Sequence, residues 1–186
     1  MILSFDFSTQ SCKAVVYDYS RVLAASSNNR FIVSVSVHFE RDLPHWKTSG
    51  GVYRGDSIPV LATNDVSSTS ARRRVNAKND RRDIASGSNV YCAPVLMWAE
   101  ALEVCVAKVQ QELQALSRNL SEITYISGGA QMHGTVYFNF GDGGYDADVD
   151  RDGDDNRVTE RITDRLVSPF ATSWMDTSTS DLVREL

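Results

Sequence analysis

The first forty residues alternate between apolar and polar positions in the way that is typical of β-strands. Two short apolar runs, at residues 2–7 and 12–18, flank a polar turn at residues 8–11. A third run, at residues 31–39, carries apolar side chains at every second position, with serine or histidine between several of them. This period of two predicts a half-buried strand. The pattern therefore predicts a β-hairpin followed by a third strand.

The period becomes helical in the middle of the chain. Between Pro94 and Leu116 the apolar side chains recur at steps of three and four residues, which places them in one stripe along a helix. Pro94 suits the first helical turn, where a missing N–H leaves no bond unmade. Met97 is interpreted as core rather than as part of a cofactor site. The expected stripe consists of Val95, Trp98, Leu102, Cys105, Val109, Leu113 and Leu116.

Shorter elements follow this helix. The pattern predicts a strand at residues 123–127 that ends in Gly128 and Gly129, another strand at residues 135–140 and a short helix at residues 158–167. An antiparallel β-meander followed by αβ units makes an α/β fold. This order resembles the incomplete N-terminal lobe of a ribonuclease-H-like, actin-like ATPase. Such proteins place their first phosphate loop at the hairpin between the first two strands.

Two polar segments interrupt the pattern and are interpreted as inserted loops. Residues 63–90 contain two arginine clusters within 72–82, which we expect to be a solvated loop rather than an interaction patch. Residues 141–157 are acidic, and their Asp148-x-Asp150-x-Asp152-Gly153 copies the first half of an EF-hand calcium loop. Its twelfth position holds Thr159 instead of glutamate, so a solvated acidic insertion is favoured over a weak calcium site.

Composition narrows the classes of function. The 186 residues carry a net charge of −5, so no basic field attracts nucleic acid. The three cysteines are widely spaced and odd in number, which favours neither a disulfide framework nor a structural zinc site. The longest apolar run, at residues 93–99, is far too short to span a bilayer. We therefore expect a soluble, cytoplasmic protein without nucleic-acid or membrane partners.

The first turn carries the strongest candidate chemistry. Asp6 stands before three small hydroxyl side chains at positions 8, 9 and 11, and Lys13 follows them. A carboxylate can bind the water of a Mg²⁺ ion, while hydroxyls and backbone N–H groups bind phosphate oxygens and a lysine balances charge. An ordinary hairpin turn has much the same composition, so the turn alone leaves both interpretations open.

Six segments, in the same order along the chain, resemble the N-terminal part of eukaryotic xylulose kinases, which belong to the FGGY carbohydrate kinase family. They lie at residues 6–11, 37–44, 50–52, 93–98, 127–134 and 174–179. The resemblance implies that residues 1–186 are part of an N-terminal kinase domain with inserted loops at 63–90 and 141–157. It also implies a sugar kinase that transfers the γ-phosphate of ATP to D-xylulose or a related ketose.

The resemblance assigns roles to particular residues. It implies that a first phosphate loop faces ATP and Mg²⁺, and that loop is formed by Asp6, Ser8, Thr9 and Gln10, with Lys13 added for its charge. It implies that His133 contacts the hydroxyls of the ketose, with Met132 and Gly134 beside it. Asp176 lies with Trp174 in a block near the sugar. A helix cap and a packing anchor are alternative roles for these two.

The family's catalytic aspartate, in a Gly-Asp-Asn block, and its adenosine-binding lobe have no match in residues 1–186. The chain is therefore expected to contain no catalytic residue and, alone, to have little or no kinase activity, because phosphoryl transfer needs groups that close around the phosphates from both sides. Residues 181–186 look like the middle of a helix, which indicates truncation. The alternative is a non-catalytic paralogue that binds a sugar or a partner protein.

Overall fold

Two β-sheets and one long helix make up most of the part of the chain that the structure describes. This computed structural model describes residues 1–18, 31–59, 90–131, 134–139, 157–163, 165–173 and 175–176. The strands are β1 (Ile2–Phe7), β2 (Ser11–Tyr17), β3 (Phe31–His38), β4 (Tyr53–Arg54), β5 (Tyr91–Pro94), β6 (Tyr125–Ala130) and β7 (Phe170–Thr172). The helices are α2 (Phe39–Asp42), α4 (Val95–Ala115) and α5 (Val158–Thr163), with short 3₁₀ turns at Pro44–Trp46, Gly55–Ser57 and Leu120–Glu122.

The larger sheet has four strands in the order β3-β2-β1-β6. The first three form an antiparallel meander, while β6 pairs in parallel with β1 from Ile2↔Tyr125 to Phe7↔Ala130. A parallel pair needs a long crossover, and the chain between β3 and β6 includes α4. The predicted meander and the mixed α/β class are confirmed. The arrangement is compatible with an actin-like or ribonuclease-H-like lobe.

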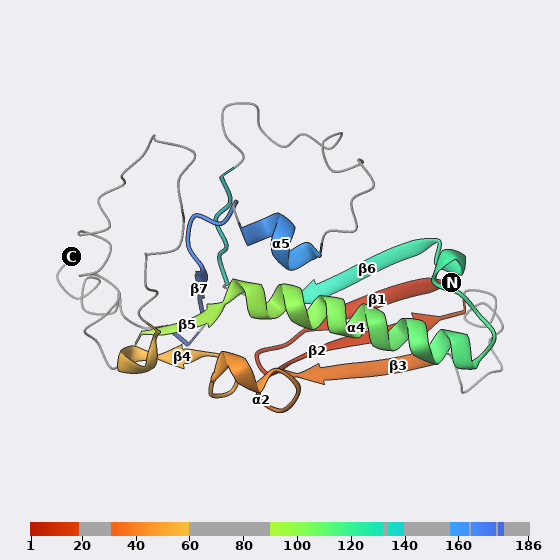
Figure 1. Cartoon of the computed structure of the whole chain (residues 1–186), viewed down its shortest axis with the longest axis horizontal. Coiled ribbons are helices and arrows are strands. Elements are labelled where there is room, and N and C mark those ends of the chain that lie inside the picture. Colours follow the sequence, from red (N-terminus) through yellow and green to blue (C-terminus); the bar gives the residue numbers. More distant parts are fainter. Residues whose placement is uncertain are drawn as a thin grey trace.

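Helix α4 lies along one face of this sheet, and the smaller sheet β4-β5-β7 stands at the end where α4 begins (Figure 1). Side chains alternate between the two faces of a strand, so every second residue of β1, β2 and β3 turns toward α4. These residues and the inner stripe of the helix form one core. It includes Leu3, Cys12, Ala14, Val16, Val33 and Val37 from the sheet and Met97, Ala101, Cys105, Val109 and Leu113 from α4.

The ends of α4 differ from the expectation in two ways. Pro94 is the last residue of β5 and the N-cap of the helix, with extended backbone, instead of a residue of the first turn. Leu116 is 51% exposed, so it is not part of the core. The reason is that the helix ends just before it: Ser117 has a φ of 58°, and the N–H of Arg118 donates to the carbonyl of Leu113 at 2.8 Å. That 6→1 bond is the signature of a Schellman cap.

Two further expectations need correction. The predicted strand at 135–140 is wrong within the described residues 134–139: Thr135 bridges Thr172 and Phe138 bridges Leu166, so the pairs go to two segments and no continuous ladder forms. The short helix ends at Thr163 instead of residue 167. The interiors of the expected loops 63–90 and 141–157, including the calcium-loop resemblance, lie outside the described residues.

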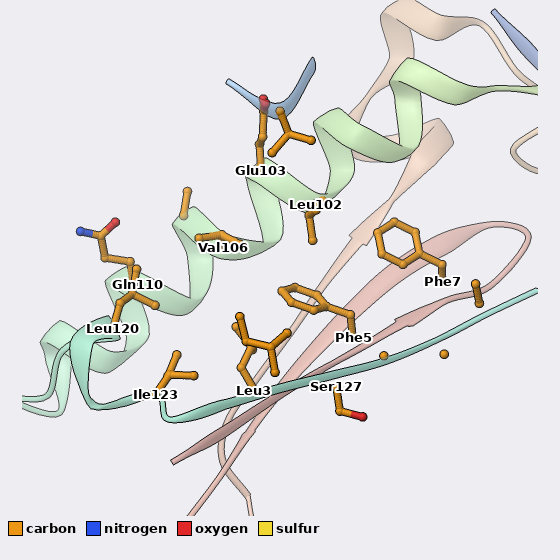
Figure 2. Close-up of a pocket in the computed structure, with 16 residues that line it drawn as sticks. Leu3, Phe5, Phe7, Leu102, Glu103, Val106, Gln110, Leu120, Ile123 and Ser127 are labelled. Atoms are coloured by element: carbon orange, nitrogen blue, oxygen red, sulfur yellow. The ribbon is translucent and has the colours of Figure 1, made fainter. Parts of the chain in front are cut away.

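The face of the large sheet under α4 is filled with buried side chains at β2 and β3, but it leaves a groove at β6. We call these the closed half and the open half of the sheet. A groove of about 1050 Å³ lies between α4 and β6, and its walls are mostly apolar. Figure 2 shows Leu3, Phe5 and Phe7 of β1 beneath Leu102 and Val106 of α4, whereas Ser127 of β6 points away from the helix. None of the described helices combines the length and apolar character that crossing a membrane requires.

Candidate functional site

The turn between β1 and β2 is a compact four-residue loop closed by its own hydroxyls. The last pair of the hairpin is Phe7↔Cys12, and beyond it the N–H of Ser8 donates to the carbonyl of Ser11 at 2.9 Å. The Ser8 hydroxyl lies 3.1 Å from that same carbonyl oxygen and 3.0 Å from the Ser11 hydroxyl. Two of the small polar side chains therefore fix the loop, and they leave Thr9 and Gln10 at its tip.

The loop tip forms one wall of an open cavity of about 700 Å³. Five hydroxyl side chains, one of them a tyrosine, contribute polar groups to its lining together with a carboxamide, an imidazole and one carboxylate. Such groups offer both donors and acceptors to a polar ligand. The cavity is lined by Ser8, Thr9, Gln10, Ser11, His38, Glu40, Ser49, Gly50, Val52, Tyr91 and Met175.

A hydrogen bond joins this loop to the segment that follows β6. The Thr9 hydroxyl donates to the side-chain oxygen of Gln131 at 3.3 Å, although the two residues are 122 positions apart. The backbone N–H of Gln131 donates to the carbonyl of Phe7 at 2.8 Å, which extends the β1–β6 pairing past the end of β6. Two of the six recognised segments therefore meet at Thr9 and Gln131.

The expected sugar-contacting residues lie at the end of that segment and in the segment after β7. Met132, His133 and Trp174 lie outside the described residues. A Cβ added to Gly134 would lie 3.7 Å from the Thr172 carbonyl oxygen, so this glycine stands against β7. The N–H of Asp176 donates to the carbonyl of Ser173 at 2.9 Å.

An electrostatic interaction with the Cys92 thiol of β5 locates Asp176 in the structure. Burial and, to a smaller extent, the negative charge of Asp176 together raise the pKa of this thiol to about 11. Cys92 pairs with Thr172 across β5 and β7. Asp176 is therefore near the small sheet, one position after Met175 in the cavity lining.

Asp6 and Lys13 are placed apart from the cavity lining. They are opposite one another in the β1–β2 register and both are exposed. Because Phe5 and Phe7 turn toward α4, strand alternation places Asp6 on the opposite face of the sheet. Within the described ranges, no group of three or more His, Cys, Asp or Glu side chains is arranged to hold a metal ion. The structure thus brings together Ser8, Thr9 and Gln10 but leaves Asp6 and Lys13 outside their cavity.

Sequence reasoning missed His38 and Glu40 as residues of this cavity. Both lie in the recognised segment 37–44, which was a signal for their importance without indicating a role. Their position depends on Asp42, whose carboxylate accepts the His38 N–H at 2.9 Å. Hydrogen bonds from Arg41 hold the pKa of Asp42 well below its usual value, with a further contribution from the charge of Lys108. A charged Asp42 therefore fixes the start of α2 beside the loop.

The known proteins that this chain is similar to include xylulose kinases from plants, rodents and yeasts. No protein-family model matches the chain. The chain is 29% identical to xylulose kinase 2 of Arabidopsis thaliana over 187 residues, which covers all of this chain and 25% of that protein. It is 32% identical to the xylulose kinase of Rattus norvegicus over 75% of its own length and 18% of the relative. For the xylulose kinase of Saccharomyces cerevisiae the identity is 29%, over 73% of this chain and 15% of the relative.

The chain thus spans about a quarter, or less, of the length of these curated relatives. Its similarity to several of them extends over most or all of its residues, and it fits their N-terminal portion. The expected resemblance is confirmed: in sequence, this chain is related to the N-terminal portion of the eukaryotic xylulose kinases.

Proposed function

We propose that this chain is the N-terminal part of an actin-like sugar kinase of the FGGY family. The whole protein would transfer the terminal phosphate of ATP to the terminal hydroxyl of D-xylulose or a related ketose, in the cytoplasm. This chain would supply the first phosphate loop and part of the sugar site, and a C-terminal lobe would supply the catalytic aspartate and the adenosine site. The similarity to xylulose kinases of plants, rodents and yeasts supports this proposal.

One contact carries the proposal. The bond from the Thr9 hydroxyl to Gln131 holds the expected phosphate loop against the segment that contains His133. A kinase needs its phosphate donor and its acceptor hydroxyl at neighbouring positions, because most of its rate acceleration comes from positioning and charge stabilisation. The parallel pairing of β1 with β6 already brings Gln131 beside the loop, and the bond from Thr9 adds a side-chain link between the two segments.

The chemistry of the loop fits the phosphates of ATP. At the wall of an open cavity, Gln10 offers amide donors to phosphate oxygens, and the hydroxyls of Ser8 and Thr9 would exchange their present bonds to Ser11 and Gln131 for bonds to the phosphates. The described residues hold no preformed cluster for a metal, so Mg²⁺ would enter with the nucleotide. The ion would neutralise phosphate charge. Asp6 and Lys13 lie outside the cavity lining, so Asp6 would meet the ion through water and not directly, and Lys13 would act through its charge alone.

On the sugar side, His133 would exchange hydrogen bonds with the ketose hydroxyls, because an imidazole both donates and accepts. Met132 and Gly134 would shape the surface beside it, and Asp176 would accept a bond from a further hydroxyl. Met175, next to Asp176, already lines the cavity of the phosphate loop. The two ligands would thus meet at one cavity.

Nuclear magnetic resonance on the ¹⁵N-labelled chain tests this function. We expect Mg·ATP to shift the amide signals of residues 8–11, and D-xylulose to shift those of residues 131–134. His133→Ala is expected to abolish the xylulose shifts and to leave the Mg·ATP shifts in place. His45→Ala is the matched control, because His45 contacts Glu100 and does not line the cavity.

The possible results separate the proposal from its rival. If neither ligand shifts these signals at about 10 mM, a concentration that detects even weak binding, the proposed site is wrong. Xylulose shifts without any Mg·ATP shifts favour a non-catalytic sugar-binding protein. Transfer of phosphate to xylulose by the pure 186-residue chain would contradict the part of the proposal that assigns catalysis to another lobe.

A further inference from the structure

A tight turn at residues 49–52 presses against the outside of the Ser8–Ser11 loop. Ser49 and Val52 form an isolated antiparallel bridge, with N–H to carbonyl distances of 2.9 and 3.3 Å. The two residues between them, Gly50 and Gly51, have φ values of 62° and 83°. Two successive positive φ angles belong to the type I′ turn, which favours glycine.

The two glycines of the turn have different surroundings. A Cβ on Gly51 would lie far closer to the Thr9 carbonyl oxygen than van der Waals contact allows, and 2.8 Å from a ring carbon of Phe39. A Cβ on Gly50 would have ordinary contacts only, the nearest at 3.6 Å from the Gln10 side chain. Gly51 is therefore needed both for its backbone angle and for its lack of a side chain, whereas Gly50 is needed for its angle alone.

The loop is held at a second point close by. The N–H of Phe39, the first residue of α2, donates to the carbonyl of Gln10 at 3.0 Å. The carbonyls of Thr9 and Gln10 thus both point at neighbours outside the loop, one at the backbone of Gly51 and one at the N–H of Phe39. The orientation of these two peptide groups sets the direction of the backbone at the tip.

Glu40 ties the turn to α2. Its carboxylate accepts the N–H of Gly50, so the turn is bonded to the helix whose first N–H binds Gln10. The loop, the turn and the start of α2 therefore form a closed set of contacts around the cavity. The turn residue Gly50 and the helix residue Glu40 also line this cavity.

We propose that Gly51 is a positioning residue of the phosphate site: its close approach to the Thr9 carbonyl fixes the Ser8–Ser11 loop in the conformation that receives the phosphates. The identity of the ligand, a phosphate group, rests on the proposed function. The contact between Gly51 and the Thr9 carbonyl does not. A side chain at position 51 forces the Thr9 peptide to move, and displaced donors bind phosphate poorly even when the fold is intact.

Gly51→Ala and Gly50→Ala are a matched pair for the test. Both variants place alanine at a positive φ and carry a similar backbone strain, but only the first collides with Thr9. In a Mg·ATP titration followed by the amide signals of residues 8–11, we expect Gly51→Ala to weaken binding at least about tenfold. Gly50 itself lines the cavity, so Gly50→Ala serves as the strain control in the ligand-free measurement and not in this titration. Leu113→Ala, which destabilises the distant core, is expected to leave the affinity unchanged while the chain is folded.

A ligand-free measurement makes the outcome independent of the proposed function. Hydrogen exchange of the Phe39 amide reports the bond to Gln10, and we expect its protection to fall in Gly51→Ala but not in Gly50→Ala. In the wild-type chain this amide must exchange as slowly as the paired amides of β3. This measurement on the wild-type chain tests the proposal even if Gly51→Ala does not fold.

Three results are decisive. Unchanged Mg·ATP affinity in folded Gly51→Ala, or an equal loss of Phe39 protection in Gly50→Ala, overturns the positioning role. Rapid exchange of the wild-type Phe39 amide also overturns it, because the loop is then not held. If the wild-type chain shows no Mg·ATP shifts, the proposed function fails, while the exchange of Phe39 still decides whether Gly51 holds the loop.

Discussion

The two halves of the large sheet lie under the same helix but are packed very differently. On the β2–β3 half, Val16 and Val37 are completely buried beneath α4. On the β6 half, Tyr125 is 65% exposed, and Ile126, which lines the groove, is 74% exposed. The reason is partly in the sequence of β6, where Gly128, which pairs with Phe5 and shares its face, provides no side chain to fill the space beneath the helix.

The closed half contains most of the hydrophobic core, whereas the open half carries the segment that is expected to contact the sugar. The core under α4 is closed by β1, β2 and β3, which also present the Ser8–Ser11 loop. The segment that contains His133 continues from β6, the weakly covered strand. The hydrogen bond from Thr9 to Gln131 therefore joins a firmly packed loop to a strand with few core contacts. We expect the two sides of the site to differ in local stability.

Core truncations give the largest expected contrast between the halves. Leu113→Ala removes a fully buried side chain and is expected to lower the free energy of unfolding by about 3 kcal/mol. Ile126→Ala on the open half is expected to lower it by less than about 1 kcal/mol, because most of that side chain is in water. Urea denaturation measures both values.

Two results would break this comparison. An equal loss of stability in Leu113→Ala and Ile126→Ala would mean that the groove is closed in solution. A change in the urea slope for Leu113→Ala would mean that the unfolded state, and not only the core, has changed. Val109→Ala, from the same buried stripe, is the repeat test on the closed half and is expected to lower stability in the same direction.

How far the sequence predicts this molecule depends on whether a feature is local. The alternation in residues 2–39 and the stripe on α4 predicted β1, β2, β3 and most of the core correctly, because side-chain periodicity reports burial directly. β5 and β7 were missed, since Tyr91–Pro94 and Phe170–Thr172 are too short for a period. Pairing with distant segments makes them strands: β5 pairs with both β4 and β7.

The candidate site divides in the same way. Ser8, Thr9 and Gln10 were identifiable as a polar turn between two strands, and the structure places them together. The contributions of His38, Glu40 and Gly51 were not visible, because they depend on a turn and a short helix that fold back onto the loop. These residues lie in the segments 37–44 and 50–52, which resemble the kinase family, but the resemblance did not indicate which part of the site they would form.

An ion cluster at the closed edge gives the next contrast, and it depends on pH. Asp42 accepts hydrogen bonds from His38 and Arg41, and Lys108 of α4 bonds to the carbonyl of Ser36 at 2.9 Å while lying 3.7 Å from Asp42. These partners lower the pKa of Asp42 below its usual value of 3.8. Asp42→Asn is expected to lower the free energy of unfolding by about 1 kcal/mol near neutral pH.

The sign of the pH dependence follows from the direction of that shift. A carboxyl whose pKa is lower in the folded than in the unfolded chain contributes its full stabilisation above the unfolded pKa and loses it as the pH falls toward the folded one. The gap between wild type and Asp42→Asn is therefore expected to shrink between about pH 5 and pH 3. Urea titrations at several pH values check this, and a gap that widens in acid would contradict the assignment.

The smallest expected contrast compares two carboxylates, one turn apart on α4, that bind opposite halves of the molecule. Glu100 accepts the Trp46 indole N–H at 2.7 Å and lies 2.9 Å from the His45 ring nitrogen, beside the closed half. Glu103 lines the groove and accepts the backbone N–H of Thr159 at 2.9 Å. Each substitution to alanine removes the partner of an N–H group that is not fully exposed.

Glu100→Ala is expected to lower the free energy of unfolding by about 1 kcal/mol, because it leaves a half-buried indole N–H without its acceptor. Glu103→Ala is expected to lower it by less than about 0.5 kcal/mol, because the N–H at the start of α5 can turn to water in the open groove. Glu100→Gln keeps an oxygen for Trp46 and should recover most of the loss. Thermal denaturation of the three variants separates these values. A larger loss in Glu103→Ala than in Glu100→Ala would show that α5 closes the groove and stabilises the β6 half, which would remove the difference between the two sides of the sheet.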